Sequence, residues 1–415
     1  MAIEKVPIDH FLELSKHFPV LDVRSPGEYS HAHIPGAFNL PLFTDEERKV
    51  IGTVYKQQSR QAAIKIGLDY FGPRIRSTVE LAEAIINNLP SDRSLTNTSS
   101  EKTDFQFPAP DSRLPTSNSR PALIHCWRGG MRSAAIAWLL DLYGFKVYTL
   151  AGGYKKYRAW VMETFSFPFS FNILGGFTGS GKTYVLEELR KKGAAVINLE
   201  KLAHHKGSAF GNIGMPEQPS QEMFENLLSH ELRKRSRKGE APGIPHSLKN
   251  SSEGLNHSTS SSLHLSETNI NHQLQTINRI WLEDESQRIG HINIPPPLWN
   301  NMRQSPIYFL AIPFEERLTH IVQEYGILNK ERMAEAIVRI QKRLGGLETK
   351  MALQHLTEGD IESCFRLLLK YYDKWYNKGL FSREKLASLL TSIECTTVNA
   401  ENNAGKIMEK ETIII

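Results

Sequence analysis

The sequence predicts an α/β protein in which two parallel-sheet domains are followed by a helical C-terminal region. Two stretches of the 415-residue chain carry this prediction. In the first, a buried strand at Pro121–Cys126 precedes a helix at Ala134–Gly144 and a second strand at Lys146–Leu150. In the second, an apolar run at Phe169–Leu174 precedes a glycine-rich turn and an amphipathic helix at Thr183–Gly193. Both stretches are typical of βα units, whose strands pair in parallel.

The expected domain limits are 1–163, 164–314 and 315–415, the last with apolar residues at helical spacing. Phe18–Ser25 and Ala194–Glu200 are further expected strands. Two polar stretches, 91–120 and 238–275, contain too few apolar residues to form a folded core. We expect them to be disordered surface insertions, one in each sheet domain.

The composition limits the class of protein. It is 40% hydrophobic and 23% charged, as in ordinary globular proteins. A net charge of +5 permits a nucleic-acid partner without requiring one. The cysteines, Cys126, Cys364 and Cys395, are too scattered for a disulfide framework or a zinc site. Because no apolar run approaches about 18 residues and no signal core begins the chain, we expect a soluble, cytoplasmic protein without a membrane partner.

The stretch "GFTGSGKT" fits the phosphate-binding pattern G-x-x-x-x-G-K-[ST] between a strand and a helix. Its glycines allow a tight turn that points backbone N–H groups at an anion, and the helix N-terminus adds positive potential. Lys182 would contact terminal phosphate oxygens, and Thr183 could hold Mg²⁺. The residues expected to form this site are Gly176, Gly179, Ser180, Gly181, Lys182 and Thr183. The pattern predicts a phosphorylated ligand without saying that it is ATP.

An acidic group follows a later apolar strand, in "RIWLEDES". A carboxylate at such a position can bind a metal ion near the phosphates. A solvated acidic turn explains the same residues equally well. Of Glu283, Asp284 and Glu285, we take Asp284 as the candidate.

The stretch "HCWRGGMRS" places Cys126 between a strand and a helix N-terminus. That position lowers the pKa of a thiol and aims several N–H groups at one point. Gly129 and Gly130 let the backbone wrap an anion, and Arg128 and Arg132 add charged donors. We therefore predict a reactive thiolate in place of a buried apolar cysteine.

Two chemistries fit this loop. In a phosphatase, Cys126 would attack phosphorus while Arg132 held the phosphate oxygens. In a chalcogen-transfer enzyme, Cys126 would carry sulfur or selenium. The loop by itself does not decide between them.

A resemblance to known families narrows the choice. "LDVRSPGEYSHAHIPGAFNLP", Leu21 to Pro41, resembles the start of rhodanese domains, and "LAGGYKKYRAW" resembles their end. In such a fold, Asp22 and Arg24 would brace the domain. The first domain is thus identified as rhodanese-like, followed by a P-loop NTPase-like α/β domain with the helical region.

Further segments resemble the tRNA 2-selenouridine synthase family. They are "LGGFTGSGKT", "LEKLAHHKGSAFG", "QPSQEMFENLL", "EDESQRIGHINIPPPLW", "RLGG" and "YYDKWY". The resemblance implies conversion of wobble 2-thiouridine in tRNA to 2-selenouridine through an S-geranylated intermediate. Geranyl diphosphate and selenophosphate, the selenium donor, would be the substrates, and no tightly bound cofactor is expected. Cys126 would match the family's rhodanese cysteine, and the Gly176–Thr183 loop would hold a diphosphate.

The chain departs from the family pattern at two positions. Asn198 stands where an acidic residue is usual, and Lys206 where an arginine is usual. Lysine keeps the charge but loses the bidentate grip on phosphate. Glu200, His205 and Ser208 are further site candidates in this segment, although a structural role suits His205 better.

Two basic clusters are candidate RNA contacts, the run "RKRSRK" at 233–238 and the group Lys155, Lys156 and Arg158. A solvated helix face explains such runs equally well. Trp127, Tyr154 and Tyr157 are candidate platforms for an unstacked base. The aromatic residues of the last long helix are expected to pack in its core, namely Tyr371, Tyr372, Trp375 and Tyr376.

Three functions remain at this point. The first is a transferase acting on tRNA. The second is a cysteine-dependent phosphatase or sulfurtransferase with a regulatory nucleotide-binding domain. The third is a non-catalytic nucleotide-binding regulator. The combination of the two domains favours the first.

Overall fold

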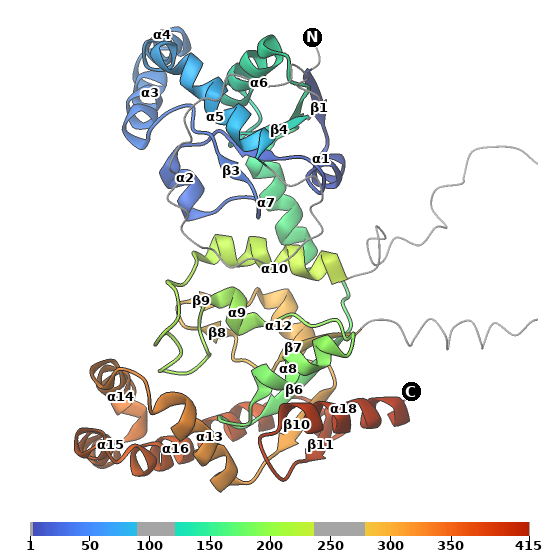
Figure 1. Ribbon diagram of the computed structural model, residues 1–415, viewed down its shortest axis with the longest axis vertical. Helices are drawn as coiled ribbons and strands as arrows, with labels where there is room; N and C mark the ends of the chain where they lie inside the picture. Colours follow the sequence, from blue (N-terminus) through green and yellow to red (C-terminus); the bar gives the residue numbers. More distant parts are fainter. Residues whose placement is uncertain (1–2, 89–120, 236–278, 415) are drawn as a thin grey trace, which may run out of the picture. The chain divides into compact units, whose positions relative to one another are not determined.

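The computed structural model describes residues 3–88, 121–235 and 279–414, so the expected insertions at 91–120 and 238–275 lie outside the described residues. The chain forms two compact units, Met1–Met162 and Glu163–Ile415 (Figure 1). Within the described part, no helix has the length and apolar content needed to cross a membrane.

The first unit is built on a five-stranded, wholly parallel sheet of order β1-β5-β4-β2-β3. Its strands are β1 (Ile3–Val6), β2 (Val20–Asp22), β3 (Phe38–Asn39), β4 (Ala122–His125) and β5 (Val147–Leu150). The sheet confirms the expected rhodanese-like α/β fold. Because β4 lies between β5 and β2, the ends of these three strands meet at one edge of the sheet.

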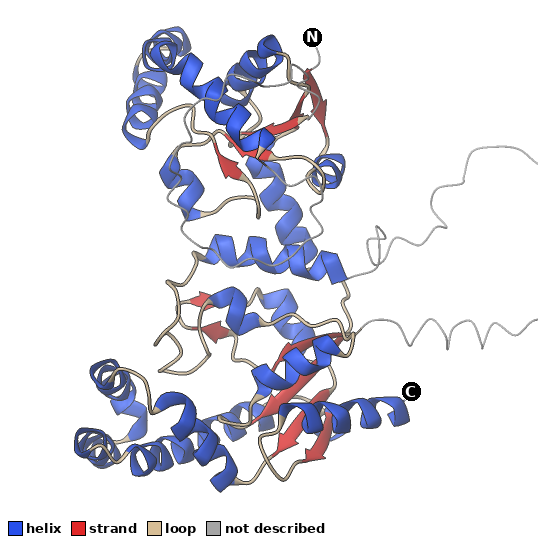
Figure 2. Ribbon diagram, viewed as in Figure 1, coloured by secondary structure: helices blue, strands red, loops and turns tan. Residues whose placement is uncertain are grey.

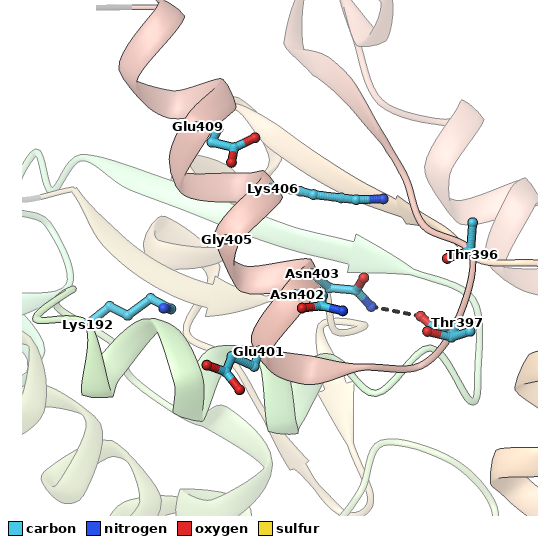
Figure 3. Close-up of a pocket in the computed structure, with 9 residues that line it drawn as sticks. All are labelled: Lys192, Thr396, Thr397, Glu401, Asn402, Asn403, Gly405, Lys406 and Glu409. Carbon is cyan, nitrogen blue, oxygen red and sulfur yellow. Dashed lines mark hydrogen bonds between the residues drawn. The ribbon is translucent and has the colours of Figure 1, made fainter.

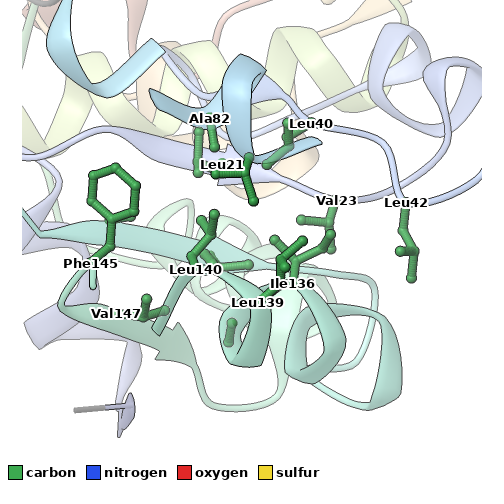
Figure 4. Close-up of a cluster of buried hydrophobic side chains, with 14 of the residues drawn as sticks. Leu21, Val23, Leu40, Leu42, Ala82, Ile136, Leu139, Leu140, Phe145 and Val147 are labelled. Carbon is green, nitrogen blue, oxygen red and sulfur yellow. The ribbon is translucent and has the colours of Figure 1, made fainter. Parts of the chain in front are cut away.

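The described part of this unit contains seven α-helices, of which α3 and α4 pack against each other (Figure 2). The seven are α1 (Ile8–Leu14), α2 (Pro26–His31), α3 (Asp45–Gln57), α4 (Arg60–Phe71), α5 (Ile75–Asn87), α6 (Met131–Tyr143) and α7 (Gly153–Thr164). Side chains of α5 and α6 pack with the strands in one apolar core, where Ile136 and Leu140 lie near Leu21 and Val147 (Figure 4). Gly144 ends α6 in the left-handed conformation, as the glycine stop predicts.

The second unit holds a four-stranded parallel sheet of order β11-β10-β6-β7. Its strands are β6 (Phe171–Gly176), β7 (Ile280–Glu283), β10 (Ile307–Ala311) and β11 (Leu390–Glu394). A small antiparallel pair, β8 (Arg288–Ile289) and β9 (Ile292–Asn293), stands apart from the sheet. The helical C-terminal region thus returns one edge strand, β11, to the sheet.

The helices of this unit fall into two groups. One group packs with the sheet, and α8 and α18 share a core with β6, β10 and β11. The other, α13 to α16, forms a second core that includes Phe210. The helices are α8 (Lys182–Lys191), α9 (Leu199–Ala203), α10 (Gln221–Arg235), α12 (Pro296–Arg303), α13 (Phe314–Tyr325), α14 (Lys330–Leu344), α15 (Gly346–Glu358), α16 (Ile361–Phe381), α17 (Leu386–Leu389) and α18 (Ala400–Ile414).

The strand expected at Ala194–Glu200 is wrong. Only Val196 forms a bridge, to Trp281, and α9 begins at Leu199. Asn198 starts that helix because its side chain accepts a hydrogen bond from the backbone N–H of Lys201 at 2.6 Å.

Candidate active site

Cys126 lies directly after the central strand β4, and the next helix, α6, begins at Met131. Its Sγ accepts a hydrogen bond from the Gly130 N–H at 3.4 Å and lies 3.3 Å from the Ser133 hydroxyl. The residue is 3% exposed. Burial opposes the thiolate, but hydrogen bonds from Ser133 and from the backbone of Gly130 and Arg128 outweigh it and lower the pKa of Cys126. This is the direction that the sequence predicts.

Two glycines let the Cys126 loop pack against the loop that precedes α7. Gly129 and Gly153 both have positive φ, +64° and +59°. A Cβ on Gly153 would lie 2.3 Å from the Cys126 carbonyl oxygen, and one on Gly129 would lie 2.6 Å from that of Leu150. The N–H of Tyr154 donates to the same Cys126 carbonyl at 2.8 Å. Backbone packing therefore fixes the loop that holds the thiol.

The two arginines of the loop are placed differently. The Arg132 guanidinium donates to Glu28 at 2.6 Å, and Arg48 contacts the same carboxylate at 2.9 Å. Burial works against ionised Glu28, but Arg132 and then Arg48 lower its pKa overall. Arg128 is exposed. An anion at this loop would thus meet Arg128 directly and would compete with Glu28 for Arg132.

A buried ion pair and a buried histidine lie close to the Cys126 loop. Asp22 and Arg24 form a bidentate ion pair, with the shortest contact at 2.6 Å, and the Arg24 guanidinium lies 3.8 Å from the Tyr154 ring centroid. This confirms the expected bracing role of the pair. His125 is fully buried, and burial lowers its pKa to about 4, so the imidazole is neutral at physiological pH.

The predicted phosphate loop joins β6 to α8. Gly176, Gly179 and Gly181 all have positive φ, which the turn requires. A Cβ on Gly179 would lie 2.8 Å from the Arg317 carbonyl oxygen. The buried Ser180 hydroxyl has no hydrogen-bond partner among the described residues. The loop thus has the tight backbone of an anion cradle at a helix N-terminus.

Lys182 and Thr183 open α8. The Lys182 ammonium donates to the Gly176 carbonyl at 2.8 Å, and the Thr183 hydroxyl donates to Glu200 at 2.9 Å. Glu200 is thereby brought to the loop from α9. Among the described residues, no group of three or more His, Cys, Asp or Glu side chains is arranged to hold a metal ion.

The three acidic residues at the end of β7 have separate environments. Glu283 is fully buried and accepts from the Leu199 N–H at 2.9 Å, and burial together with Glu200 raises its pKa to about 8. Burial and then repulsion from Glu200 also raise the pKa of Glu285 well above its usual value. Asp284 is bound by the Tyr376 hydroxyl at 2.7 Å and by Arg383. Both carboxylate oxygens of Asp284 are therefore engaged by protein side chains.

Tyr376 is a neighbour of the phosphate loop that sequence reasoning placed in the helical core. Its hydroxyl accepts from the Gly176 N–H at 3.1 Å while donating to Asp284. Tyr371 and Tyr372 do pack against the helical core, as expected. Trp375 is 39% exposed, so its expected place in the core is wrong. The repeated aromatic residues of α16 gave no signal that separated these roles.

The remaining candidates lie in the segment after α9. His205 is 6% exposed, and burial lowers its pKa, which fits the structural role expected of it. Lys206 forms an ion pair with Glu324. The Ser208 hydroxyl accepts from the Phe210 N–H at 3.2 Å. Ser208 also hydrogen-bonds Tyr325 and Tyr372, so it joins its loop to the helical region.

Several of the residues expected to contact RNA have other roles. Tyr154 and Tyr157 are fully buried, so neither can stack on a base, and the expectation of such platforms is wrong for both. In the basic run at 233–238, Arg233 donates to Thr164 at 2.7 Å and Arg235 pairs with Glu231; residues 236–238 lie outside the described part. Trp127 is 37% exposed.

A cavity of about 490 Å³ opens between the end of α8 and the start of α18 (Figure 3). Its described lining is polar and includes Lys192, Asn403 and Lys406. Asn403 donates to the Thr397 carbonyl at 3.0 Å, and Lys406 donates to the Glu394 carbonyl. No residue of the phosphate loop is among those described as lining it.

Comparison with known proteins places the chain in a family. The model of the tRNA 2-selenouridine synthase AAA domain matches residues 169–244 and 260–400, more than half of the chain. The chain belongs to the tRNA 2-selenouridine synthase family. The rhodanese-like domain model matches residues 9–66, which lie before the Cys126 loop. Membership makes the chain an enzyme and accounts for a rhodanese-like unit joined to a phosphate-loop unit.

Members of the family are similar to this chain over most of their length. The tRNA 2-selenouridine synthase of Bdellovibrio bacteriovorus is 29% identical, with 92% of this chain and 94% of that protein covered. Those of Pseudomonas fluorescens Pf-5 and Sulfurovum sp. are each 30% identical, covering 88% and 86% of this chain and 89% and 84% of theirs. The family likeness thus extends across both units.

Proposed function

We propose that this enzyme converts wobble 2-thiouridine in tRNA to 2-selenouridine in two steps. Geranyl diphosphate supplies a geranyl group in the first step, and selenophosphate supplies selenium in the second. One observation carries the proposal. A single chain of this family contains both a phosphate loop and a loop that lowers the pKa of Cys126. Each loop suits one of the two phosphorylated substrates.

We assign the first step to the phosphate loop. The 2-thio sulfur attacks C1 of geranyl diphosphate, a C–S bond forms, and the C–O bond to diphosphate breaks. The N3 proton of the base leaves to solvent as the thiocarbonyl becomes a thioether. The helix N-terminus at Lys182 and the backbone N–H groups from Gly179 to Thr183 would hold the departing diphosphate.

We assign the second step to the Cys126 loop. The backbone N–H groups at the start of α6 and the exposed Arg128 would bind the tetrahedral phosphate of selenophosphate beside the thiolate. The selenium of selenophosphate attacks C2, the C2–S bond breaks and geranyl thiol leaves with a proton from solvent. Water then cleaves the Se–P bond, which releases phosphate and leaves 2-selenouridine. Because Glu28 forms an ion pair with Arg132, it would compete with the bound anion for the Arg132 guanidinium.

Mg²⁺ fits the phosphate loop as an accessory ion. Thr183 and Glu200 offer two adjacent oxygens, and Mg²⁺ in phosphate sites commonly takes few protein ligands and completes its shell with water and phosphate. Bound there, it would neutralise charge on the leaving diphosphate.

The test of the proposal is Lys182→Ala, with Lys192→Ala as a matched loss of one positive charge in the same unit. Both proteins are incubated with tRNA containing 2-thiouridine and both substrates, and nucleosides are measured by mass spectrometry. The rate of geranylation by Lys182→Ala should be at least about tenfold lower than that of the wild type, because one charged contact to phosphate is removed. The variant should still make selenouridine from tRNA that is already geranylated. Geranylation at the wild-type rate by Lys182→Ala would contradict the assignment.

A further inference from the structure

We propose that an exposed patch on α14 and α16 binds single-stranded RNA of the tRNA substrate. The inference rests on the proposed function and adds to it the surface that holds the RNA. We call this surface the Trp375 patch. It consists of the exposed residues Arg343, Lys374, Trp375 and Lys378, and the half-buried Tyr371 links it to the helical core.

The patch combines an exposed indole with cations. Trp375 is 39% exposed, although most large aromatic side chains are largely buried. The Arg343 guanidinium lies 5.5 Å from the centroid of its ring, and the Lys378 ammonium lies 5.1 Å from it. The Tyr371 ring is 6.4 Å away at an angle of 60°. Both cations are thus held at the aromatic surface by cation–π attraction.

The positive charges of the patch have no acidic partner. Arg343, Lys374 and Lys378 are all exposed, and none forms an ion pair with a described residue. The acidic residue next to Lys374, Asp373, is committed to Arg317 at 2.8 Å. Two cations at the exposed ring and a third on the residue before it, Lys374, complement a polyanion.

The opposite side of α16 is fixed to the phosphate-loop region. The Tyr376 hydroxyl contacts the Gly176 N–H, the Tyr372 hydroxyl accepts from the Ala209 N–H at 3.3 Å, and Asp373 pairs with Arg317. Arg317 in turn donates to the Thr178 carbonyl at 3.0 Å. One helix therefore contacts the phosphate loop on one side and presents the Trp375 patch on the other, so a single element links the proposed RNA surface to the phosphate loop.

Single-stranded RNA matches this chemistry better than other polyanions. An unstacked base can lie on the Trp375 ring, and the long Arg343 and Lys378 side chains can then turn to the flanking phosphates. An acidic protein segment would use the cations alone and would leave the indole without a role. Duplex RNA offers phosphates but keeps its bases stacked.

The experiment measures binding of the full-length protein to a synthetic anticodon-loop RNA hairpin carrying 2-thiouridine, by fluorescence anisotropy at several KCl concentrations. The variant Arg343→Gln/Lys378→Gln should bind about tenfold more weakly at low salt, and the slope of log K against log salt should fall by about 1 to 2. The control Lys192→Gln/Lys410→Gln makes the same charge change on the α8–α18 side of the unit and should bind like the wild type (Figure 1).

Substitution of the indole separates stacking from charge. Trp375→Leu should weaken binding roughly tenfold without changing the salt slope, whereas Trp375→Phe, which keeps a ring, should bind nearly as the wild type does. Thermal melting of every variant shows whether it is folded. A fully paired RNA duplex should not distinguish Trp375→Leu from wild type.

Equal binding by the patch variants and the control pair would overturn the inference. If those variants also convert tRNA normally, the proposed function stands and only the location of the RNA surface is wrong. If the wild-type protein itself fails to bind the hairpin and to modify tRNA, the proposed function falls together with the patch.

Discussion

The pKa of Cys126 results from two opposed effects. Burial favours the neutral thiol, while the Ser133 hydroxyl and three backbone N–H groups favour the thiolate and prevail. The pKa values of the other two cysteines show the effect of burial without such hydrogen-bond donors. Burial raises the pKa of Cys364 to about 12 and also raises that of Cys395. The loop, and not the residue type, therefore makes Cys126 the candidate nucleophile.

The pH dependence of alkylation tests this difference. Because the pKa of Cys126 is lowered, its thiolate forms at lower pH, so iodoacetamide should reach its full rate below the pH required by free cysteine, whose pKa is about 8.5. Ser133→Ala should move the profile to higher pH, and Ser77→Ala, on the surface of α5, should not. Peptide mass spectrometry resolves the three cysteines, and a Cys126 profile unchanged by Ser133→Ala would refute the account.

Side-chain partners, which sequence spacing does not reveal, decide the roles of the acidic residues at the end of β7. Asp284 looked like the metal-binding carboxylate but bonds Tyr376 and Arg383, which are separated from it by 92 and 99 residues in sequence. Glu283 points into the protein and bonds the N–H of Leu199. Such long-range partners become visible only in the folded chain.

The elements that carry the two sites were predictable where a motif coincided with a clear change from strand to helix. β4 with α6, and β6 with α8, are such cases. Helix α3, which buries no residue fully, was not foreseen. Strand β11 was also missed, since its pairing of Leu390 with Ile307 joins residues far apart in sequence.

The packing of the α7 entry loop on the Cys126 loop makes a prediction for stability. Gly153→Ala should lower the free energy of unfolding by more than about 2 kcal/mol, since a left-handed conformation and a backbone collision combine. Gly36 also has a positive φ, +79°, but no atom lies within 4 Å of an added Cβ, so Gly36→Ala should lower the free energy of unfolding by about 1 kcal/mol. Gly130→Ala, with no atom within 4 Å of the added Cβ, should stay within about 0.5 kcal/mol. Urea unfolding measures all three, and equal losses for Gly153→Ala and Gly130→Ala would show that the two loops do not pack as described.

The complete chain joins two units that each present a loop at the carboxyl edge of a parallel sheet. In the proposed reaction, the phosphate loop serves prenyl transfer and the Cys126 loop serves selenium transfer. A single-site enzyme would lose both products when either loop was damaged. Two sites acting in sequence predict instead that damage to the second loop leaves the intermediate behind.

Mass spectrometry of wobble nucleosides from cells that contain only the Cys126→Ala protein tests this division most directly. If the two loops act in sequence, 2-selenouridine should disappear while S-geranyl-2-thiouridine is still formed and accumulates. Cells with Cys364→Ala should match the wild type, since Cys364 lies in the helical core of the second unit. Normal levels of 2-selenouridine in the Cys126→Ala cells, or loss of the geranylated nucleoside together with 2-selenouridine, would contradict the assignment of the two steps to two loops.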